Sequence, residues 1–228
     1  HFANIQETLA LLLTRAQEQL GEILVCSGIT GSGGLTLSKH LQIPFTQEVV
    51  AVASALKAEA PQTDVAIELG GEDAKIIYFT GGIDQRMNGI CAGGTGSFID
   101  QMASLLQTDA SGLNQYAENY QMIYPIAARC GVFAKSDIQP LINEGATRED
   151  LAASIFQAVV NQTISGLACG KPIRGHVAFL GGPLHFLSEL KAAFIRTLKL
   201  DDEHIIDTAN SHLFAAIGSA LNAKEEVY

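Results

Sequence analysis

Three glycine-rich turns in this sequence are candidates for binding an anionic ligand. They are Gly70-Gly71, Gly93-Gly94-Thr95-Gly96 and Gly181-Gly182, and each follows a run of strand character. Glycine after a strand lets backbone amides approach a phosphate closely, and a following helix N-terminus adds its dipole. Plain turns also contain glycine, but three such turns in one chain favour a nucleotide-binding site.

Carboxylates accompany the first of these turns. Glu68 ends an apolar run, and Glu72 and Asp73 stand in the turn that follows. A carboxylate at the end of a buried strand can hold a hydrated Mg²⁺, and acidic residues in the next turn can orient an attacking water. The alternative is that Glu72 and Asp73 are ordinary polar turn residues. Both interpretations stay open at this point.

Two of the four cysteines, Cys91 and Cys130, each precede a predicted helix start. Helix N-termini stabilise anionic thiolates, so both are candidates for nucleophiles or metal ligands, against the alternative of inert buried thiols. An iron–sulfur cluster takes four thiolates, which a symmetric dimer could supply as two from each copy. Cys26 and Cys169 have no such placement, and we expect both to be structural core residues.

Composition and charge exclude several classes of protein. The chain has 228 residues, 47% hydrophobic and 17% charged, which is typical of one large or two small globular domains. A net charge of −10 argues against a nucleic-acid partner. No stretch approaches the roughly 20 apolar residues that span a bilayer, and no signal-peptide pattern is seen. Widely spaced cysteines without a CxxC pair indicate reduced thiols. We therefore expect a cytoplasmic protein with neither a membrane nor a nucleic acid as partner.

Helical and strand patterns supply the elements that position these residues. Thr147 to Asp150 is typical of a capping box with Asp in place of Glu, and Gly81-Gly82 is typical of a two-residue hairpin turn. The helices are predicted over residues 4–20, 47–59, from 97, 111–119, 132–143, from 147 to about 168, 184–198 and 209–223. The strands are predicted over residues 23–26, 65–69, 74–80, 83–90, 176–180 and 204–207.

The order of these elements predicts an α/β fold. Three strands in a meander precede a helix, and later strands alternate with helices. Two such units around a cleft form the actin, Hsp70 and sugar-kinase arrangement, which places glycine turns on both sides of a nucleotide. We expect residues 1–63 to be the remnant of an N-terminal subdomain whose first strands and first phosphate loop lie upstream. Residues 64–208 would form the C-terminal subdomain with the phosphate and cluster loops, and residues 209–228 a C-terminal helix.

Four motifs in this order carry a resemblance to a known family: Glu68-Leu-Gly-Gly-Glu-Asp-Ala-Lys75, Cys91-Ala-Gly-Gly-Thr-Gly-Ser-Phe98, Arg129-Cys-Gly-Val-Phe-Ala-Lys-Ser-Asp137 and Leu180-Gly-Gly-Pro183. With the 39-residue interval from Cys91 to Cys130, they resemble the BadF/BadG/BcrA/BcrD ATPase family. That family includes the activators of 2-hydroxyacyl-CoA dehydratases and subunits of benzoyl-CoA reductase.

The resemblance implies a function as well as a fold. It implies an actin-like ATPase and a homodimer sharing one [4Fe-4S] cluster, with Cys91 and Cys130 of each subunit as ligands. ATP would be held by the turn from Glu68 to Asp73 and by the loop from Cys91 to Gly96, with Gly181-Gly182 beside the adenosine. ATP binding and hydrolysis would drive one low-potential electron into a dehydratase or reductase.

The chain departs from the family pattern at several positions. We expect the family's opening phosphate loop to lie upstream of this sequence. Glu68 replaces the usual Asp, and Glu72 replaces a usual Gln. Lys135 stands where an acidic residue is common. These features resemble the activase-like domain of very large fused proteins.

Three functions from different classes therefore stand side by side. The first is an ATP-dependent electron-transfer activator. The second is a non-catalytic regulatory or assembly domain of a large multidomain protein. The third is a kinase with an actin-like fold and no cluster, in which Cys91 and Cys130 are core thiols. Whether this stretch of chain is an enzyme by itself stays open.

Overall fold

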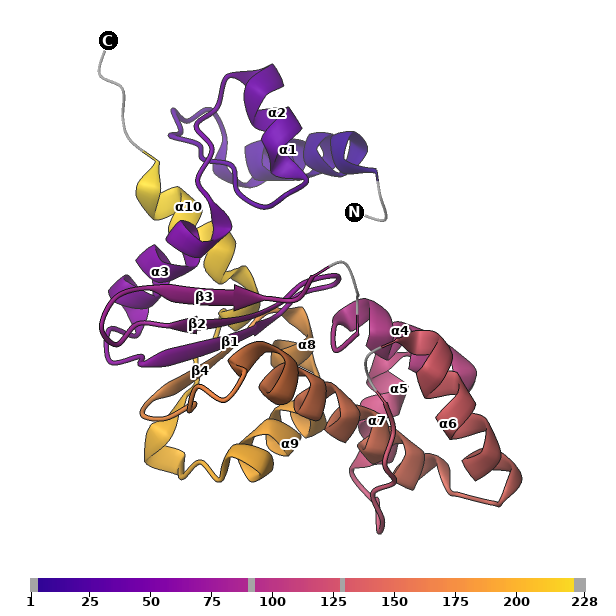
Figure 1. Ribbon diagram of the computed structural model, residues 1–228. Helices are drawn as coiled ribbons and strands as arrows, with labels where there is room; N and C mark the ends of the chain where they lie inside the picture. The colour runs from indigo at the N-terminus through magenta and orange to yellow at the C-terminus, as the bar shows by residue number, and fades with distance from the viewer. Residues whose placement is uncertain (1–3, 90–92, 128–129, 224–228) are drawn as a thin grey trace. The chain divides into compact units, whose positions relative to one another are not determined.

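The computed structural model describes residues 4–89, 93–127 and 130–223 (Figure 1). These residues divide into two compact units. The first combines the described residues of His1–Ala58 with those of Ala215–Tyr228, and the second is Glu59–Phe214. The subdomain boundaries expected after residues 63 and 208 stay predictions.

The first unit is helical. It carries α1 (Ile5–Leu20), α2 (Gly34–Leu41), and most of α3 (Glu48–Glu59) and of α10 (Phe214–Asn222). The α1 helix begins where the Asn4 side chain accepts a hydrogen bond from the Glu7 amide, and it ends at Gly21, as predicted. The α2 helix was not anticipated from the sequence. The α3 and α10 helices are joined by a hydrogen bond from the Asn222 amide to the Ser54 hydroxyl, 2.9 Å.

The strand predicted over residues 23–26 is wrong. This segment has no regular structure, and Leu24 is 97% exposed. A strand needs a neighbour for its backbone hydrogen bonds. Among the described residues of the first unit, the one β-type pairing is the isolated bridge between Ile29 and Phe45.

A mixed five-stranded sheet organises the second unit (Figure 1). Its order is β3-β2-β1-β4-β5, with β1 antiparallel to β2, β2 antiparallel to β3, and β1, β4 and β5 parallel. The predicted meander is thereby confirmed. The connection between β2 and β3 spans residues 79–83, because Tyr78 pairs with Asp84, so it is longer than the predicted two-residue turn. The strands are β1 (Val65–Leu69), β2 (Ala74–Tyr78), β3 (Asp84–Met87), β4 (Val177–Leu180) and β5 (Ile205–Ile206).

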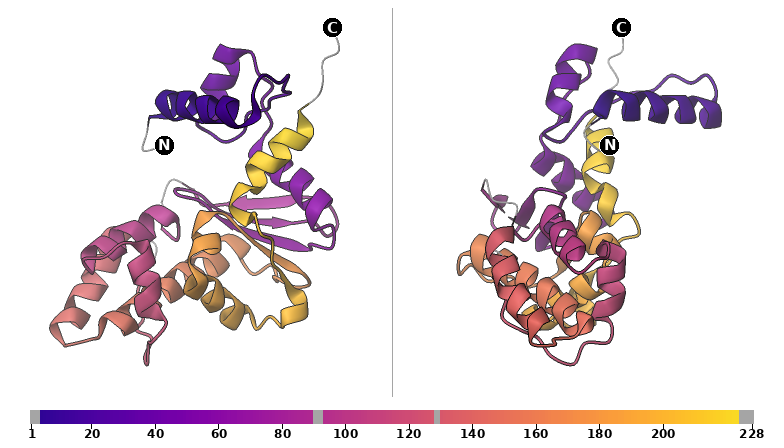
Figure 2. Two further views of the ribbon diagram at one scale, coloured as in Figure 1. Left: turned by 180° about the vertical axis from the view of Figure 1, so that it is seen from behind. Right: turned by 90° about the vertical axis from the view of Figure 1, so that its right-hand side faces the viewer.

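Helices pack against the sheet and against one another. The α7 helix contacts α4, α5 and α9, and Figure 2 lets the reader follow this group from two further sides. The predicted helix over 184–198 is broken at Leu187 into α8 and α9. The helices are α4 (Gly96–Leu105), α5 (Ala110–Ala117), α6 (Gly131–Asn143), α7 (Arg148–Thr163), α8 (Gly182–Phe186) and α9 (Ser188–Leu198). Shorter elements are a π-helix (Ile164–Ala168) and two 3₁₀ turns (Asp202–His204 and Ser211–Leu213).

One hydrophobic core joins the sheet to these helices. Alternate residues of β1, Ile67 and Leu69, are fully buried in the same cluster as Phe98, Phe156 and Phe194 from three helices. Fully burying a side chain of this size contributes about 1.5–3 kcal/mol, so this core fixes where the strands end. The turns that follow the strands are positioned with them.

The α7 helix is central to that core. Its N-terminus is capped as predicted, with the Thr147 hydroxyl accepting a hydrogen bond from the Asp150 amide, 3.1 Å. Together with the π-helix it is long and apolar enough, by length and composition alone, to cross a membrane, which differs from the expectation that no stretch of the sequence has that length. Because 67% of its most apolar stretch is buried inside the protein, we interpret it as the core helix of this unit.

Candidate functional site

Two of the predicted glycine turns meet at the carboxyl ends of neighbouring parallel strands. Gly70-Gly71 follows β1, and Gly181-Gly182 follows β4, which pairs with β1 in parallel. Gly181 has φ +91°, and a Cβ there would lie 2.0 Å from the backbone oxygen of Leu69. Only glycine permits this approach. The carboxyl ends of parallel strands are also where ligands bind in open α/β sheets.

The third turn is tied to the first by main-chain hydrogen bonds. The Gly96 amide donates to the Gly70 carbonyl, 2.9 Å, and the Ser97 amide donates to the Gly71 carbonyl, 2.7 Å. Gly96 is the first residue of α4, and Thr95 before it is fully buried. Gly93 and Gly94 form the turn that leads into this helix start. The three predicted turns therefore form one structural unit.

A cavity of about 360 Å³ opens where the three turns meet. This volume lies in the range of small-molecule sites, which are mostly apolar with a few polar groups. Asp100 contributes the one carboxylate among the described lining residues. Phe186, 68% exposed, contributes an aromatic ring. The lining residues are Gly71, Gly96, Ile99, Asp100, Ala110, Gly182, Pro183, Phe186 and Leu187.

Histidines and a serine support the Gly181-Gly182 turn. Nδ1 of His185 lies 2.8 Å from the Ser211 hydroxyl, and the Ser211 carbonyl accepts a hydrogen bond from the Gly181 amide, 3.1 Å. The ring centroids of His185 and His212 are 4.0 Å apart, and Phe186 packs edge-on against His185. No sequence pattern points to Ser211, because it lies 30 residues after Gly181 and comes close only through the tertiary fold.

Two of the three predicted acidic residues lie beside one lysine, and the third is exposed. Glu68 is 8% exposed, and its carboxylate lies 3.8 Å from Nζ of Lys75, its cross-strand partner on β2. Asp73 lies 3.9 Å from the same ammonium group. Glu72 is exposed. Lys75 thus gathers two of the three predicted carboxylates.

Asn88 holds the acidic turn in place. Its side-chain oxygen accepts a hydrogen bond from the Ala74 amide, 2.8 Å, and its amide group donates to the Glu72 carbonyl, 3.2 Å. This asparagine follows β3 directly and spans the turn between the two preceding strands. Sequence reasoning missed it, although an asparagine just after a strand is a common turn-stabilising residue.

The cysteines divide into three cases. Cys130 is a half-buried free thiol at the N-cap of α6, which begins at Gly131 as expected. Cys91 lies outside the described residues. Cys26 and Cys169 are exposed, so their prediction as core residues is wrong. Cys26 belongs to the segment without a strand neighbour, and Cys169 takes a left-handed conformation, φ 48°, where the π-helix ends.

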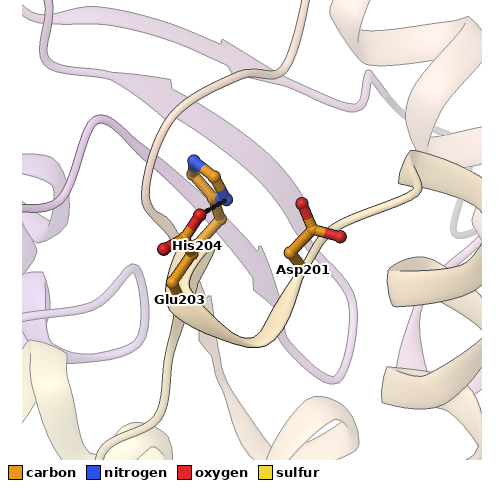
Figure 3. Close-up of side chains that lie close together, drawn as sticks. All are labelled: Asp201, Glu203 and His204. Carbon is orange, nitrogen blue, oxygen red and sulfur yellow. Dashed lines mark ion pairs between the residues drawn. The ribbon is translucent and has the colours of Figure 1, made fainter.

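A second group of titratable side chains lies at the opposite end of the sheet. Asp201, Glu203 and His204 place their possible ligand atoms within 4.8 Å of one another, just before β5 begins (Figure 3). Next to them, the amide of His176 donates to Asp64, 2.8 Å, and this hydrogen bond lowers the pKa of that carboxyl group. Exposed groups of this kind are common without a metal ion, so this cluster is no evidence for one.

The sequence is similar to that of a known protein family and to several of its members. Residues 1–223 match the BadF/BadG/BcrA/BcrD ATPase family. The 2-hydroxyisocaproyl-CoA dehydratase activator of Clostridioides difficile is 32% identical over 169 residues, 73% of this chain and 62% of that protein. The activator of lactoyl-CoA dehydratase from Anaerotignum propionicum is 31% identical over 185 residues, 78% of this chain and 68% of that protein.

Solved structures agree with the sequence comparison. The activator of the 2-hydroxyisocaproyl-CoA dehydratase from Clostridium difficile with bound ADPNP has a TM-score of 0.82 at 28% identity, covering 94% of this chain and 80% of that one. Component A of the Acidaminococcus fermentans (R)-2-hydroxyglutaryl-CoA dehydratase has a TM-score of 0.76 at 28% identity, covering 85% and 73%. The predicted fold class, an actin-like ATPase fold, is confirmed by these neighbours.

Proposed function

The chain belongs to the BadF/BadG/BcrA/BcrD ATPase family, and we propose that it is the ATP-binding part of an activator that passes a low-potential electron to a 2-hydroxyacyl-CoA dehydratase-type enzyme. One observation carries the proposal: three glycine turns, distant in sequence, converge on a single cavity at the carboxyl ends of parallel strands. The chain spans 62% of the length of the Clostridioides difficile activator. Its activity and partners are therefore proposed for the protein that contains it.

The cavity suits the base and ribose of ATP. Its walls are largely apolar, with the rings of Pro183 and Phe186 available to a flat heterocycle. The phosphates would then lie along Gly70-Gly71 and the Gly93–Gly96 turn, since glycine leaves the backbone open to an anion. The ADPNP bound by the solved relative supports a nucleotide as the ligand.

Glu68 is the residue that would hold Mg²⁺. Its carboxylate lies at the end of a buried strand, and oxygen ligands of this kind suit a magnesium ion that keeps its waters. When bound, the ion neutralises charge that develops on the transferred phosphoryl group. Lys75 compensates and orients the Glu68 carboxylate, and Asp73 or Glu72 would orient the attacking water.

Cys130 meets the requirements of a ligand to an iron–sulfur cluster. It is a free, half-buried thiol at the N-cap of a thirteen-residue helix, and cysteine sulfur is the usual protein ligand of such clusters. Cys91 would be the second ligand of each chain, and a homodimer would complete the set of four. When bound, such a cluster supplies one-electron transfer at low potential. The proposed role of this chain is to hold the cluster with two cysteine ligands and to bind ATP at turns that lie close to those cysteines in the sequence.

Iron content tests the proposal. The protein is purified without oxygen, reconstituted with iron and sulfide, and examined for iron per protomer and for a dithionite-reduced EPR signal. About two irons per protomer are expected, together with loss of both iron and signal in Cys130→Ala and in Cys91→Ala. Cys26→Ala and Cys169→Ala are matched controls, because both thiols are exposed and lie outside the proposed ligand set. Full iron in Cys130→Ala would refute the cluster assignment.

A second function is favoured by one specific observation. The carboxylate proposed to hold Mg²⁺ is already close to a buried lysine, which favours a domain that binds ATP without hydrolysing it. Such a domain would regulate or assemble a larger protein. Isothermal titration with ATP and a phosphate-release assay separate the two functions, since binding without turnover supports the second.

A further inference from the structure

Thr163 has an environment that the fold alone does not explain. It is the last residue of α7, it is 1% exposed, and its hydroxyl is buried without a hydrogen-bond partner. A threonine in a helix ordinarily bonds back to the carbonyl four residues earlier. Thr197 does so to Ala193, 2.8 Å, and Ser165, only two residues away, does so to Asn161, 2.5 Å.

An unpaired buried hydroxyl is unfavourable, because the group gives up its hydrogen bonds to water and gains none. Valine has the same shape and would fill the same space without this cost. The position also marks a change of helix type, because a π-helix begins at Ile164 directly after Thr163. Single π-helical turns occur frequently at functional sites.

The Thr163 hydroxyl points toward the loop that begins α4. A Cβ built on Gly94 would lie 3.7 Å from that hydroxyl oxygen and 3.3 Å from Cγ of Gln162. Gly94 has φ +81°, a conformation that side chains rarely adopt, so the glycine brings its backbone against this end of α7. The hydroxyl therefore faces a backbone segment of the candidate nucleotide site.

The other end of the π-helix contacts the strand that enters the same loop. Nη1 of Arg86 on β3 donates to the Ala168 carbonyl, 2.6 Å. The π-helix thus lies against β3 near its C-terminal end, and the last two residues of α7, directly before it, lie against Gly94. A movement of the Gly93–Gly96 turn would therefore change the contacts of Thr163.

We propose that Thr163 is a positioning residue for the nucleotide: its hydroxyl forms a hydrogen bond with the backbone of Gly93-Gly94 when this turn closes on the phosphates of a nucleoside triphosphate. The inference rests on the proposed function, and Thr163 acts on the nucleotide by positioning the Gly93-Gly94 backbone. In the absence of nucleotide the hydroxyl is unpaired, and in the complex it is satisfied. Because the complex gains this hydrogen bond, the hydroxyl strengthens nucleotide binding.

Two substitutions at this position test the proposal. Thr163→Val removes the hydroxyl and keeps the shape, and Thr163→Ser keeps the hydroxyl. We expect the melting temperature of nucleotide-free Thr163→Val to equal or exceed that of the wild type. Its affinity for a non-hydrolysable ATP analogue, measured by isothermal titration, is expected to fall about tenfold, the scale of one hydrogen bond. Thr163→Ser is expected to bind within about twofold of the wild type.

Thr63→Val is the matched control. Thr63 is also buried, but its hydroxyl already donates to the Ala60 carbonyl, 2.8 Å. This substitution should lower the melting temperature and leave the affinity unchanged. Thr163→Val is therefore expected to lose affinity without losing stability, and Thr63→Val to lose stability without losing affinity.

The outcomes distinguish this inference from the proposed function. Wild-type affinity in Thr163→Val refutes the inference alone. Equal loss of affinity in the Val and Ser variants, with lower melting temperatures in both, assigns Thr163 a structural role and also refutes it. A wild-type protein that binds no nucleotide refutes both the proposed function and the inference.

Discussion

The two ends of the central sheet carry similar side chains and are built in different ways. At the carboxyl ends of β1 and β4, three turns contact one another through backbone atoms, and the Glu68–Lys75 pair beside them is buried. At the amino ends, Asp64 pairs with His176, and Glu203 and His204 stand at the surface. Both ends offer carboxylates with cationic or imidazole partners.

The difference shows what makes one end a candidate site. Asp64 has a lowered pKa, yet the main cause is a backbone amide, that of His176, whose position follows from strand pairing. Perturbed ionisation at this end is thus a consequence of the fold. At the other end, a cavity and close backbone contacts restrict which residues can be present. The candidate site is therefore identified by the backbone turns that meet at one cavity, and not by a shifted pKa.

The largest effect is expected from a methyl group at the contact between the turns. Gly181→Ala places a Cβ 2.0 Å from the Leu69 carbonyl oxygen in a backbone conformation that disfavours side chains. We expect the free energy of unfolding to fall by about 3 kcal/mol, measured by urea unfolding. Gly182→Ala is the adjacent control for stability, because no atom lies within 4 Å of its Cβ position. Its effect on stability should be within about 0.5 kcal/mol. Equal stability of both variants would contradict the close contact.

The buried ion pair should give the next largest effect. Glu68→Gln removes a charge beside Lys75, whose side chain is 5% exposed, and should lower the free energy of unfolding by about 2 kcal/mol. ATP hydrolysis should be lost with it. The double variant Glu68→Gln/Lys75→Met should regain most of the stability but no hydrolysis, because an uncharged pair packs well and cannot hold Mg²⁺. Hydrolysis by the double variant would exclude Glu68 from the catalytic role.

Much of the second unit could be predicted from sequence, because its signals are local. The bounds of β1 and the start of α6 follow from apolar runs and from the residues that flank them. The three glycine turns were recognised one by one, each after a strand. Their meeting at one cavity depends on the parallel pairing of β1 with β4, which a pattern of residues does not specify.

The failures share a physical cause. The apolar run at residues 23–26 has strand character, but a strand forms only when a neighbour accepts its hydrogen bonds. The roles of Lys75 and Ser211 at the site could not be predicted for the same reason, because each contacts a residue that strand pairing or packing brings close to it. Cys169 was placed in the core as the end of an apolar helix, whereas a left-handed cap turns it to the surface.

The smallest effect is expected at the amino end of the sheet. Because the pKa of Asp64 is lowered by folding, its carboxylate stabilises the folded protein above its ordinary value of 3.8, and this stabilisation is lost as the pH falls through the folded pKa. Its side chain is 40% exposed, so Asp64→Asn should cost less than about 1 kcal/mol at pH 7. The difference between variant and wild type should shrink in urea unfolding as the pH is lowered below 3.8. Nucleotide affinity at pH 7 should be unchanged, and a loss of affinity in Asp64→Asn would mean that the two ends of the sheet are coupled.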